Sequence, residues 1–191
     1  MKVLSTFINN FHVLPKESYQ KFLALTELKT ICSKGVLAKV GETPKELFIL
    51  KRGVVRSYYT DEKGKEYIRS LFIPFSATGS FGALISNKPS ELTYDCLTDC
   101  EIYAINFKAL KQLALENIDI AYMYANALDS IFLLFESRIY DLTVLNATER
   151  YLKLKEEIPE VENLIPLYHI ASYLNVSAVQ LSRIRKKISL E

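Results

Sequence analysis

The chain has 191 residues, of which 49% are hydrophobic and 24% are charged, and its formal net charge is +2. This composition is typical of a globular protein with one large domain or with a medium and a small one. The small net charge gives no overall basic excess that would by itself indicate a nucleic-acid partner. The three cysteines are too few for a disulfide framework and lack zinc-site spacing, so we interpret Cys32, Cys96 and Cys100 as buried thiols.

The first residues predict a helix. Apolar side chains from Leu4 to Phe11 follow a helical stripe that Asn9 and Asn10 interrupt, unlike the continuous apolar core of a signal peptide. No uninterrupted apolar run approaches the roughly 18 residues of a membrane span. We therefore expect a cytoplasmic protein without membrane contact.

From about residue 30 to residue 106 the pattern changes from helical to strand-like. Short runs rich in β-branched and aromatic residues alternate with turn residues. These runs are "GVLAKVG", "ELFILKRG", "VVRSYYT", "YIRSLFIP", "TYDCL" and "EIYAIN". The stretch "YYTDEKGKEYI" predicts a hairpin with Gly64 at a position of positive φ. Many short strands at regular spacing favour an antiparallel sandwich or barrel.

A short helix, "NFKALKQLALEN", is predicted next, and a long one follows without any Gly or Pro. The long helix carries a seam of apolar residues spaced alternately three and four apart: Ile118, Ala121, Ala125, Leu128, Phe132, Phe135, Ile139 and Leu142. A second apolar flank runs beside it: Ile120, Tyr124, Ala127, Ile131 and Leu134. Two apolar faces need two partners, so we predict packing on the β-domain and a homodimer through the seam. A single helix buried inside one domain is the alternative.

A domain boundary is expected at residues 145–150, with Thr148 as the cap of a helix that ends at Pro159. Pro166 then fits the first turn of another helix, "LYHIASYL". After a tight turn, Ser177 and Gln180 form the pattern of a capping box for a last helix. Two short helices joined by a tight turn predict a helix-turn-helix. We divide the chain into 1–116, 117–146 and 147–191.

The last helix has a basic face. Between Ser177 and Leu190 there are four cations and no acidic residue, as a surface that meets phosphates requires. Arg183 is the main candidate for base recognition and Gln180 could read adenine, although its capping role competes. The candidate DNA contacts are Ser177, Val179, Gln180, Ser182, Arg183, Lys186, Lys187, Tyr168 and His169. For His169 a plain surface position is an equal alternative, and Arg185 is expected to face inward toward an intramolecular carboxylate.

The order of these parts resembles the cyclic-AMP receptor protein/Fnr family of bacterial transcription regulators, and the resemblance covers nearly the whole chain. Its best matches are "ELFILKRGVVRSYYTDEKGKEYIRSLFIP" and "YHIASYLNVSAVQLSRIRKKI", the second close to members of the Bacteroidetes type. The resemblance implies an α+β fold: a cyclic-nucleotide-binding-like antiparallel β-roll or jelly roll, a long dimerisation helix and a C-terminal helix-turn-helix. It implies a homodimer on a two-fold symmetric site in double-stranded DNA, with RNA polymerase as a further candidate partner.

Two departures from the family bear on DNA binding. Many members carry Glu where this chain has Val179, which removes an acceptor for cytosine and offers a methyl contact to thymine. Many members also continue into a small β-wing, whereas this sequence ends three residues after Ile188. We therefore expect a different operator sequence and no wing contacts.

The nucleotide pocket departs further. The family pairs a Gly-Glu-Leu turn, whose Glu binds the ribose, with an Arg-Ser or Arg-Thr step whose Arg binds the cyclic phosphate. The matching residues here, our candidate effector pocket, are Gly82, Ala83, Leu84, Ser90 and Glu91. Burying a phosphate without a cation is costly. We therefore expect no cyclic-AMP binding in the usual way, and an unknown small-molecule effector or none.

Other functional classes fit less well. An iron–sulfur cluster needs four cysteines, and haem or a cupin metal site needs histidines that lie close together. The two histidines, His12 and His169, lie at opposite ends of the sequence, so we expect no metal, no cofactor, no catalytic residues and no enzyme. The alternatives that stay open are a sensor module that signals through protein contacts and a cyclic-nucleotide-binding regulatory module.

Overall fold

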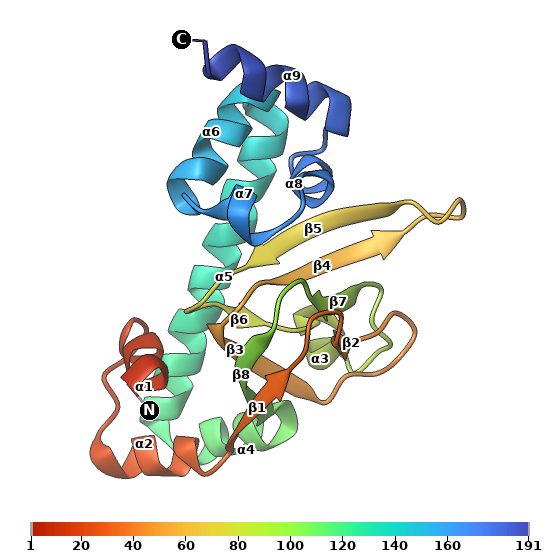
Figure 1. Cartoon of the computed structure of the whole chain (residues 1–191). Coiled ribbons are helices and arrows are strands. Elements are labelled where there is room, and N and C mark those ends of the chain that lie inside the picture. Colours follow the sequence, from red (N-terminus) through yellow and green to blue (C-terminus); the bar gives the residue numbers. More distant parts are fainter. Residues whose placement is uncertain (1, 191) are drawn as a thin grey trace.

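The computed structural model describes residues 2–190 of the chain. Two short helices, α1 (Lys2–Asn9) and α2 (Lys16–Leu23), lie beside the lower half of the long helix α5 (Ile118–Val144) (Figure 1). A roll of strands lies against the middle of α5, and a group of helices caps its far end (Figure 1). The helical N-terminal pattern was predicted, and the structure interrupts it between Asn9 and Lys16.

The roll consists of two four-stranded antiparallel sheets. One sheet has the order β1 (Thr26–Ile31), β8 (Cys100–Asn106), β3 (Glu46–Arg52), β6 (Ala77–Thr78). The other has the order β2 (Val36–Ala38), β7 (Thr93–Cys96), β4 (Val55–Thr60), β5 (Glu66–Phe72). All six predicted runs form strands. The predicted runs did not include β1 or β6, and the short helix α3 (Phe81–Ser86) was not predicted either.

The predicted hairpin joins β4 and β5. Gly64 has φ +79°, and the Asp61 carboxylate accepts hydrogen bonds from the backbone N–H groups of Lys63 and Lys65, both at 2.9 Å. An Asx-type turn of this kind fixes the loop and therefore the register of the two strands. The prediction of a hairpin at this point is confirmed.

The core of the roll is closed at one end by the N-terminal helices. Leu4, Ile8 and Phe22 are at most 2% exposed and pack against Ile105 and Ile120 of the roll and α5. Burying such side chains stabilises the fold by about 1.5–3 kcal/mol each. The interpretation of the cysteines was wrong for one of them: Cys96 and Cys100 are buried, but Cys32 is exposed. It lies in the turn after β1, outside both sheets.

The predicted short and long helices are both present, as α4 (Phe107–Glu116) and the uninterrupted α5. The Asn117 side chain begins α5 by accepting a hydrogen bond from the Ile120 N–H at 3.1 Å. In the part of the chain that the structure describes, α5 is the one helix long and apolar enough to cross a membrane, with a mean hydropathy of 1.3 over 18 residues. The sequence shows no unbroken apolar run of this length because polar residues such as Asn126 and Asp129 interrupt α5.

The side of α5 that faces the rest of the chain is held against protein at its two ends, whereas Leu134, which was predicted to pack on the β-domain, is 69% exposed. Ile120 and Met123 are buried in the roll. Farther along, Asp141 binds the Lys153 ammonium at 2.7 Å, and Arg138 donates a hydrogen bond to the Tyr173 carbonyl. These contacts hold one side of α5 against the rest of the chain, and the opposite side of the helix is exposed.

The helical group at the far end of α5 contains α6 (Ala147–Glu157), α7 (Val161–Leu164), α8 (Leu167–Tyr173) and α9 (Ala178–Ile188). The cap of α6 was predicted at the wrong residue. Asn146, not Thr148, accepts the N–H groups of Thr148 and Glu149 at 2.9 and 3.1 Å, and the Glu149 carboxylate accepts from the Asn146 N–H at 2.7 Å. Asn is as good an N-cap as Thr or better, and its position completes a capping box with Glu149.

Candidate nucleic-acid interface and effector pocket

Helices α8 and α9 form the predicted helix-turn-helix. Ile170, Leu174 and Leu181 are at most 1% exposed, and Ala171 is 2% exposed. Asn175 makes the turn with φ +55°, in the left-handed region that Asn adopts more readily than most residues. The two helices therefore pack through an apolar seam and hold α9 at a fixed angle to α8.

Ser177 caps α9 by accepting a hydrogen bond from the Gln180 N–H at 3.1 Å. Among the described hydrogen bonds there is none from the Gln180 side chain back to Ser177, so only one half of the predicted capping box is seen. The Gln180 side-chain amide therefore does not take part in the helix cap and is available to read a base. Gln180 is exposed.

The outer face of α9 is exposed and basic. Val179 is 63% exposed, and Ser182, Arg183, Lys186 and Lys187 are exposed beside it. No ion pair or side-chain hydrogen bond within residues 2–190 is described for these three cations. Their charges are therefore available to an external partner.

Arg185 has a different role, as predicted. Its Nε and Nη2 donate to the two oxygens of Glu162 at 2.8 and 3.1 Å, a paired geometry that gives a strong charge-assisted contact. Burial, together with the Glu162 carboxylate, raises the pKa of Tyr151 to about 12. This network joins α6, α7 and α9 from the inside and keeps the Arg185 charge out of the outer face.

The prediction for His169 is wrong, whereas Tyr168 is exposed as expected. Tyr168 is 60% exposed, but His169 is only 7% exposed and faces the roll. The Nδ1 atom of His169 lies 3.2 Å from Nη1 of Arg56 on β4. His169 lies near the start of α8 as predicted, but its side chain is buried against Arg56 and cannot contact DNA in this arrangement.

Arg56 is the centre of a buried polar cluster between the roll and α8. Its Nε and Nη2 donate to the Asp95 carboxylate at 2.7 and 3.0 Å, and its Nη1 donates to Glu66. Although burial alone would lower it, the hydrogen bonds that Arg56 donates to Asp95 and Glu66 raise the pKa of Arg56. Burial first, and then the Arg56 charge, lower the pKa of His169. A neutral His169 therefore accepts a bond from a permanently charged Arg56.

Backbone contacts reinforce this junction. The Ser172 hydroxyl of α8 accepts from the Ile68 N–H at 3.0 Å and donates to the Glu66 carbonyl at 3.1 Å. Figure 1 shows α8 lying directly over the β4–β5 hairpin. Val54 and Leu71 of the roll belong to the same apolar cluster as the helix-turn-helix. The helix-turn-helix is thus docked on the roll through α8, while α9 points away from it.

The predicted dimer seam is largely exposed. Ile118, Phe132 and Ile139 are 67%, 62% and 60% exposed, and Phe135 and Leu142 are 42% exposed. Ala125 is exposed, and Ala121 and Leu128 are half-buried. Monomeric soluble proteins rarely expose a continuous apolar surface of this extent. The face is therefore typical of one that another protein surface covers.

A pocket of about 850 Å³ lies between the roll, α5 and the helices α6 and α8. Gly82, Ala83 and Glu91 of the predicted effector site line it. Two other predicted residues do not: Leu84 is buried in the apolar core, and the Ser90 hydroxyl is buried and bonded to Ser80 at 2.8 Å. The side chains of α3 alternate between core and pocket, which explains why the three-residue turn does not act as one unit.

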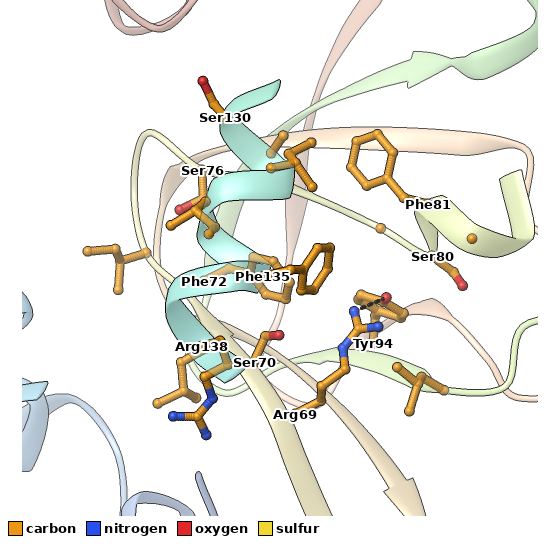
Figure 2. Close-up of a pocket in the computed structure, with 18 of the residues that line it drawn as sticks. Arg69, Ser70, Phe72, Ser76, Ser80, Phe81, Tyr94, Ser130, Phe135 and Arg138 are labelled. Atoms are coloured by element: carbon orange, nitrogen blue, oxygen red, sulfur yellow. Dashed lines mark hydrogen bonds between the residues drawn. The ribbon is translucent and has the colours of Figure 1, made fainter. Parts of the chain in front are cut away.

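Two arginines in the pocket were missed. Figure 2 shows Arg69 of β5 directed at Tyr94, and its Nη2 donates to the Tyr94 hydroxyl at 2.7 Å. Arg138 of α5 also lines the pocket. The sequence has no arginine between these two residues, and the fold brings both ends of that segment to the same cavity. No signal within either segment indicates this convergence.

Within the described residues there is no group of three or more His, Cys, Asp or Glu side chains that could hold a metal ion. The pocket does not fit a cyclic nucleotide held in the family's manner. Ala83 stands where the ribose-binding carboxylate is expected, and the only arginines in the pocket among residues 2–190, Arg69 and Arg138, come from other elements.

Comparisons with known proteins agree with this architecture. Residues 28–117 match the model of the cyclic nucleotide-binding domain. The cAMP-activated global transcriptional regulator CRP of Salmonella typhimurium is 26% identical over 129 residues, covering 68% of this chain and 61% of that protein. CRP of Klebsiella aerogenes matches equally. The matched part thus spans about three fifths of the length of these curated relatives.

Solved structures share the fold over most of the chain. FixK2 from Bradyrhizobium japonicum has a TM-score of 0.70 at 16% identity, covering 86% of this chain and 85% of that chain. A regulator assigned to the crp/fnr family from Eubacterium rectale has a TM-score of 0.72 at 13% identity, covering 93% and 84%. This chain is thus similar in sequence to CRP and in fold to a regulator of the Crp/Fnr family, and residues 28–117 match the cyclic nucleotide-binding domain.

Proposed function

We propose that this chain is a sequence-specific DNA-binding transcriptional regulator that acts as a homodimer in the cytoplasm. The observation that carries the proposal is the outer face of α9, where Arg183, Lys186 and Lys187 are exposed and no acidic residue occurs between Ser177 and Leu190. Relatives that are named as transcriptional regulators support it. RNA polymerase is the partner on which such a regulator would act.

In this proposal the exposed side chains of α9 divide their roles. Arg183 binds a guanine through its paired N–H groups, and Val179 offers a methyl contact to thymine. Lys186 and Lys187 bind phosphates, which positions the helix without selecting a sequence. Ser177, Gln180, Ser182 and Tyr168 lie exposed around them and are the further contacts.

Dimerisation places two such helices at a fixed distance. The exposed face of α5, including Phe132 and Ile139, would be covered by the same face of a second copy. Two recognition helices related by a two-fold axis meet successive major grooves about 34 Å apart. The units in this proposal are 1–116 for the roll, 117–146 for the dimer helix and hinge, and 147–191 for DNA binding.

The test is DNA binding by the full chain, measured by fluorescence anisotropy on sites selected from a random pool. The affinity should fall steeply with salt, and Lys186→Gln should reduce the salt slope by about one unit. Arg183→Ala should cost about 1–3 kcal/mol on the selected site and relax its sequence preference. Arg52→Ala, which removes an exposed arginine on the roll (80% exposed side chain), is the matched control and should change neither quantity. Absence of salt-dependent binding to any DNA would leave the protein-contact sensor as the better hypothesis.

A further inference from the structure

The pocket between the roll, α5 and the terminal helices has the size of a binding site for a small organic molecule. Its volume of about 850 Å³ lies within the range of about 300–1,000 Å³ that is usual for such sites. Several aromatic rings line it, among them Phe72, Phe81 and Phe135 (Figure 2). Rings of this kind favour a flat or bulky apolar body.

One end of the pocket carries a charge without a compensating acid. Arg69 donates one hydrogen bond, from Nη2 to the Tyr94 hydroxyl at 2.7 Å, and its guanidinium lies 5.4 Å from the centre of the Phe135 ring. No ion pair is described for Arg69 anywhere in residues 2–190. A guanidinium has five N–H donors. Its remaining donors can bind the two oxygens of a carboxylate in parallel.

A second arginine has a donor that lacks an acceptor. The Nε atom of Arg138 is buried and, within the described residues, has no hydrogen-bond partner. Its guanidinium stacks 3.9 Å from the centre of the Tyr173 ring and is directed away from Tyr94 (Figure 2). A buried donor without an acceptor is unfavourable. Its presence here favours a site that an external acceptor completes.

The charges of the pocket match a singly charged anion. Three cations line it, Arg69, Lys88 and Arg138, against the two acids Glu91 and Glu157, which leaves one positive charge in excess. A cyclic nucleotide also carries one negative charge, but its ribose and base need polar partners. Ala83 supplies no carboxylate where the ribose would be bound, and the uncharged polar side chains of the wall are hydroxyls, among them those of Ser70 and Ser130.

We propose that this pocket binds an organic acid with one carboxylate and a bulky, preferably aromatic, apolar body. Arg69 binds the carboxylate, and the apolar body lies among Phe72, Phe81 and Phe135. This assignment rests on the proposed regulator function for its biological meaning, but the binding itself does not depend on DNA.

The same pocket would connect the acid to DNA binding. Leu154 of α6 and Tyr173 of α8 are part of its wall, and both belong to the unit that carries α9. A ligand that contacts the roll and this unit together stabilises the arrangement in which the two walls meet. Binding of the acid therefore favours the position of α9 seen in this structure over other positions relative to the dimer helix.

The test is isothermal titration calorimetry on the full chain without DNA. The probes are 2-naphthoate and its neutral analogue 2-naphthylmethanol, with cyclic AMP as a third ligand. We expect the acid to bind at least about tenfold more tightly than the alcohol, as a charged hydrogen bond implies. Arg69→Gln should remove that difference, Arg69→Lys should retain part of it, and the control Arg52→Gln should leave it unchanged.

Three other outcomes would contradict the proposal. Equal affinity for acid and alcohol would show that no cation selects the ligand, and this comparison needs no variant that must fold. Tighter binding of cyclic AMP than of 2-naphthoate would restore the nucleotide as the ligand. Absence of binding by the dimer would indicate that the second copy fills the cavity. If 2-naphthoate binds as expected but no DNA does, the regulator function fails while the pocket assignment stands.

Discussion

The buried pair of Arg56 and Asp95 makes a quantitative prediction about the junction between the roll and the helix-turn-helix. The two residues lie directly opposite each other on β4 and β7, and their side chains are 7% and 12% exposed. Arg56→Met leaves the Asp95 carboxylate buried without its partner, which should lower the free energy of unfolding by about 3–5 kcal/mol.

The double variant is expected to be more stable than this single one. With Asp95→Val added, no unpaired charge stays buried, since Glu66 has a 40% exposed side chain and can be solvated. Replacing a buried pair by apolar side chains is often neutral or stabilising. We therefore expect a coupling free energy of at least about 2 kcal/mol between the two positions.

The assay is urea denaturation of the full chain followed by circular dichroism, for the wild type, both single variants and the double variant. The pair Glu17 and Lys21 on α2, with 78% and 50% exposed side chains, provides a control cycle in which no measurable coupling is expected. Additive effects of Arg56→Met and Asp95→Val, within about 0.5 kcal/mol, would refute the reasoning.

Three further predictions concern other parts of the molecule. Burial and Arg56 lower the pKa of His169 from 6.5, so the unfolded chain takes up a proton first as the pH falls below about 6.5. The contribution of His169 to the free energy of unfolding is therefore full above that pH and falls toward the lowered pKa by at most about 1.4 kcal/mol per pH unit. Urea denaturation at several pH values should find this slope in the wild type and not in His169→Gln. Phe132→Asp should give a monomer in light scattering with the circular dichroism spectrum of the folded chain retained, because Phe132 is 62% exposed in the protomer; a surviving dimer would contradict the seam. Asn146→Ala should cost about 1 kcal/mol, measured by denaturation, and Thr148→Ala clearly less; the reverse order would contradict the observed cap.

The sequence was sufficient for elements whose signal is local. The runs that form β3, β4 and β8 are rich in β-branched and aromatic residues, and all three are strands. The heptad spacing gave the length of α5. Strand β1 was not among the predicted runs, because "TELKTI" is mostly polar and its Leu28 is 53% exposed.

The parts that were not predicted depend on contacts between distant segments. His169 is separated from Arg56 by 113 residues, and no local pattern distinguishes a histidine that faces DNA from one that faces a buried arginine. The pocket arginines, Arg69 and Arg138, likewise acquire their role only when β5 packs near α5. Position in the fold, rather than residue type, determines what these side chains can bind.

The most direct test of the account is the affinity of the chain for a selected two-fold symmetric DNA site and for the same site with about five base pairs, half a helical turn, inserted at its centre. Two α9 helices held at fixed spacing by α5 predict that the insertion reduces the affinity to that for non-specific DNA. Equal affinity for both sites would contradict the claim that the dimer helix sets the distance between two recognition helices.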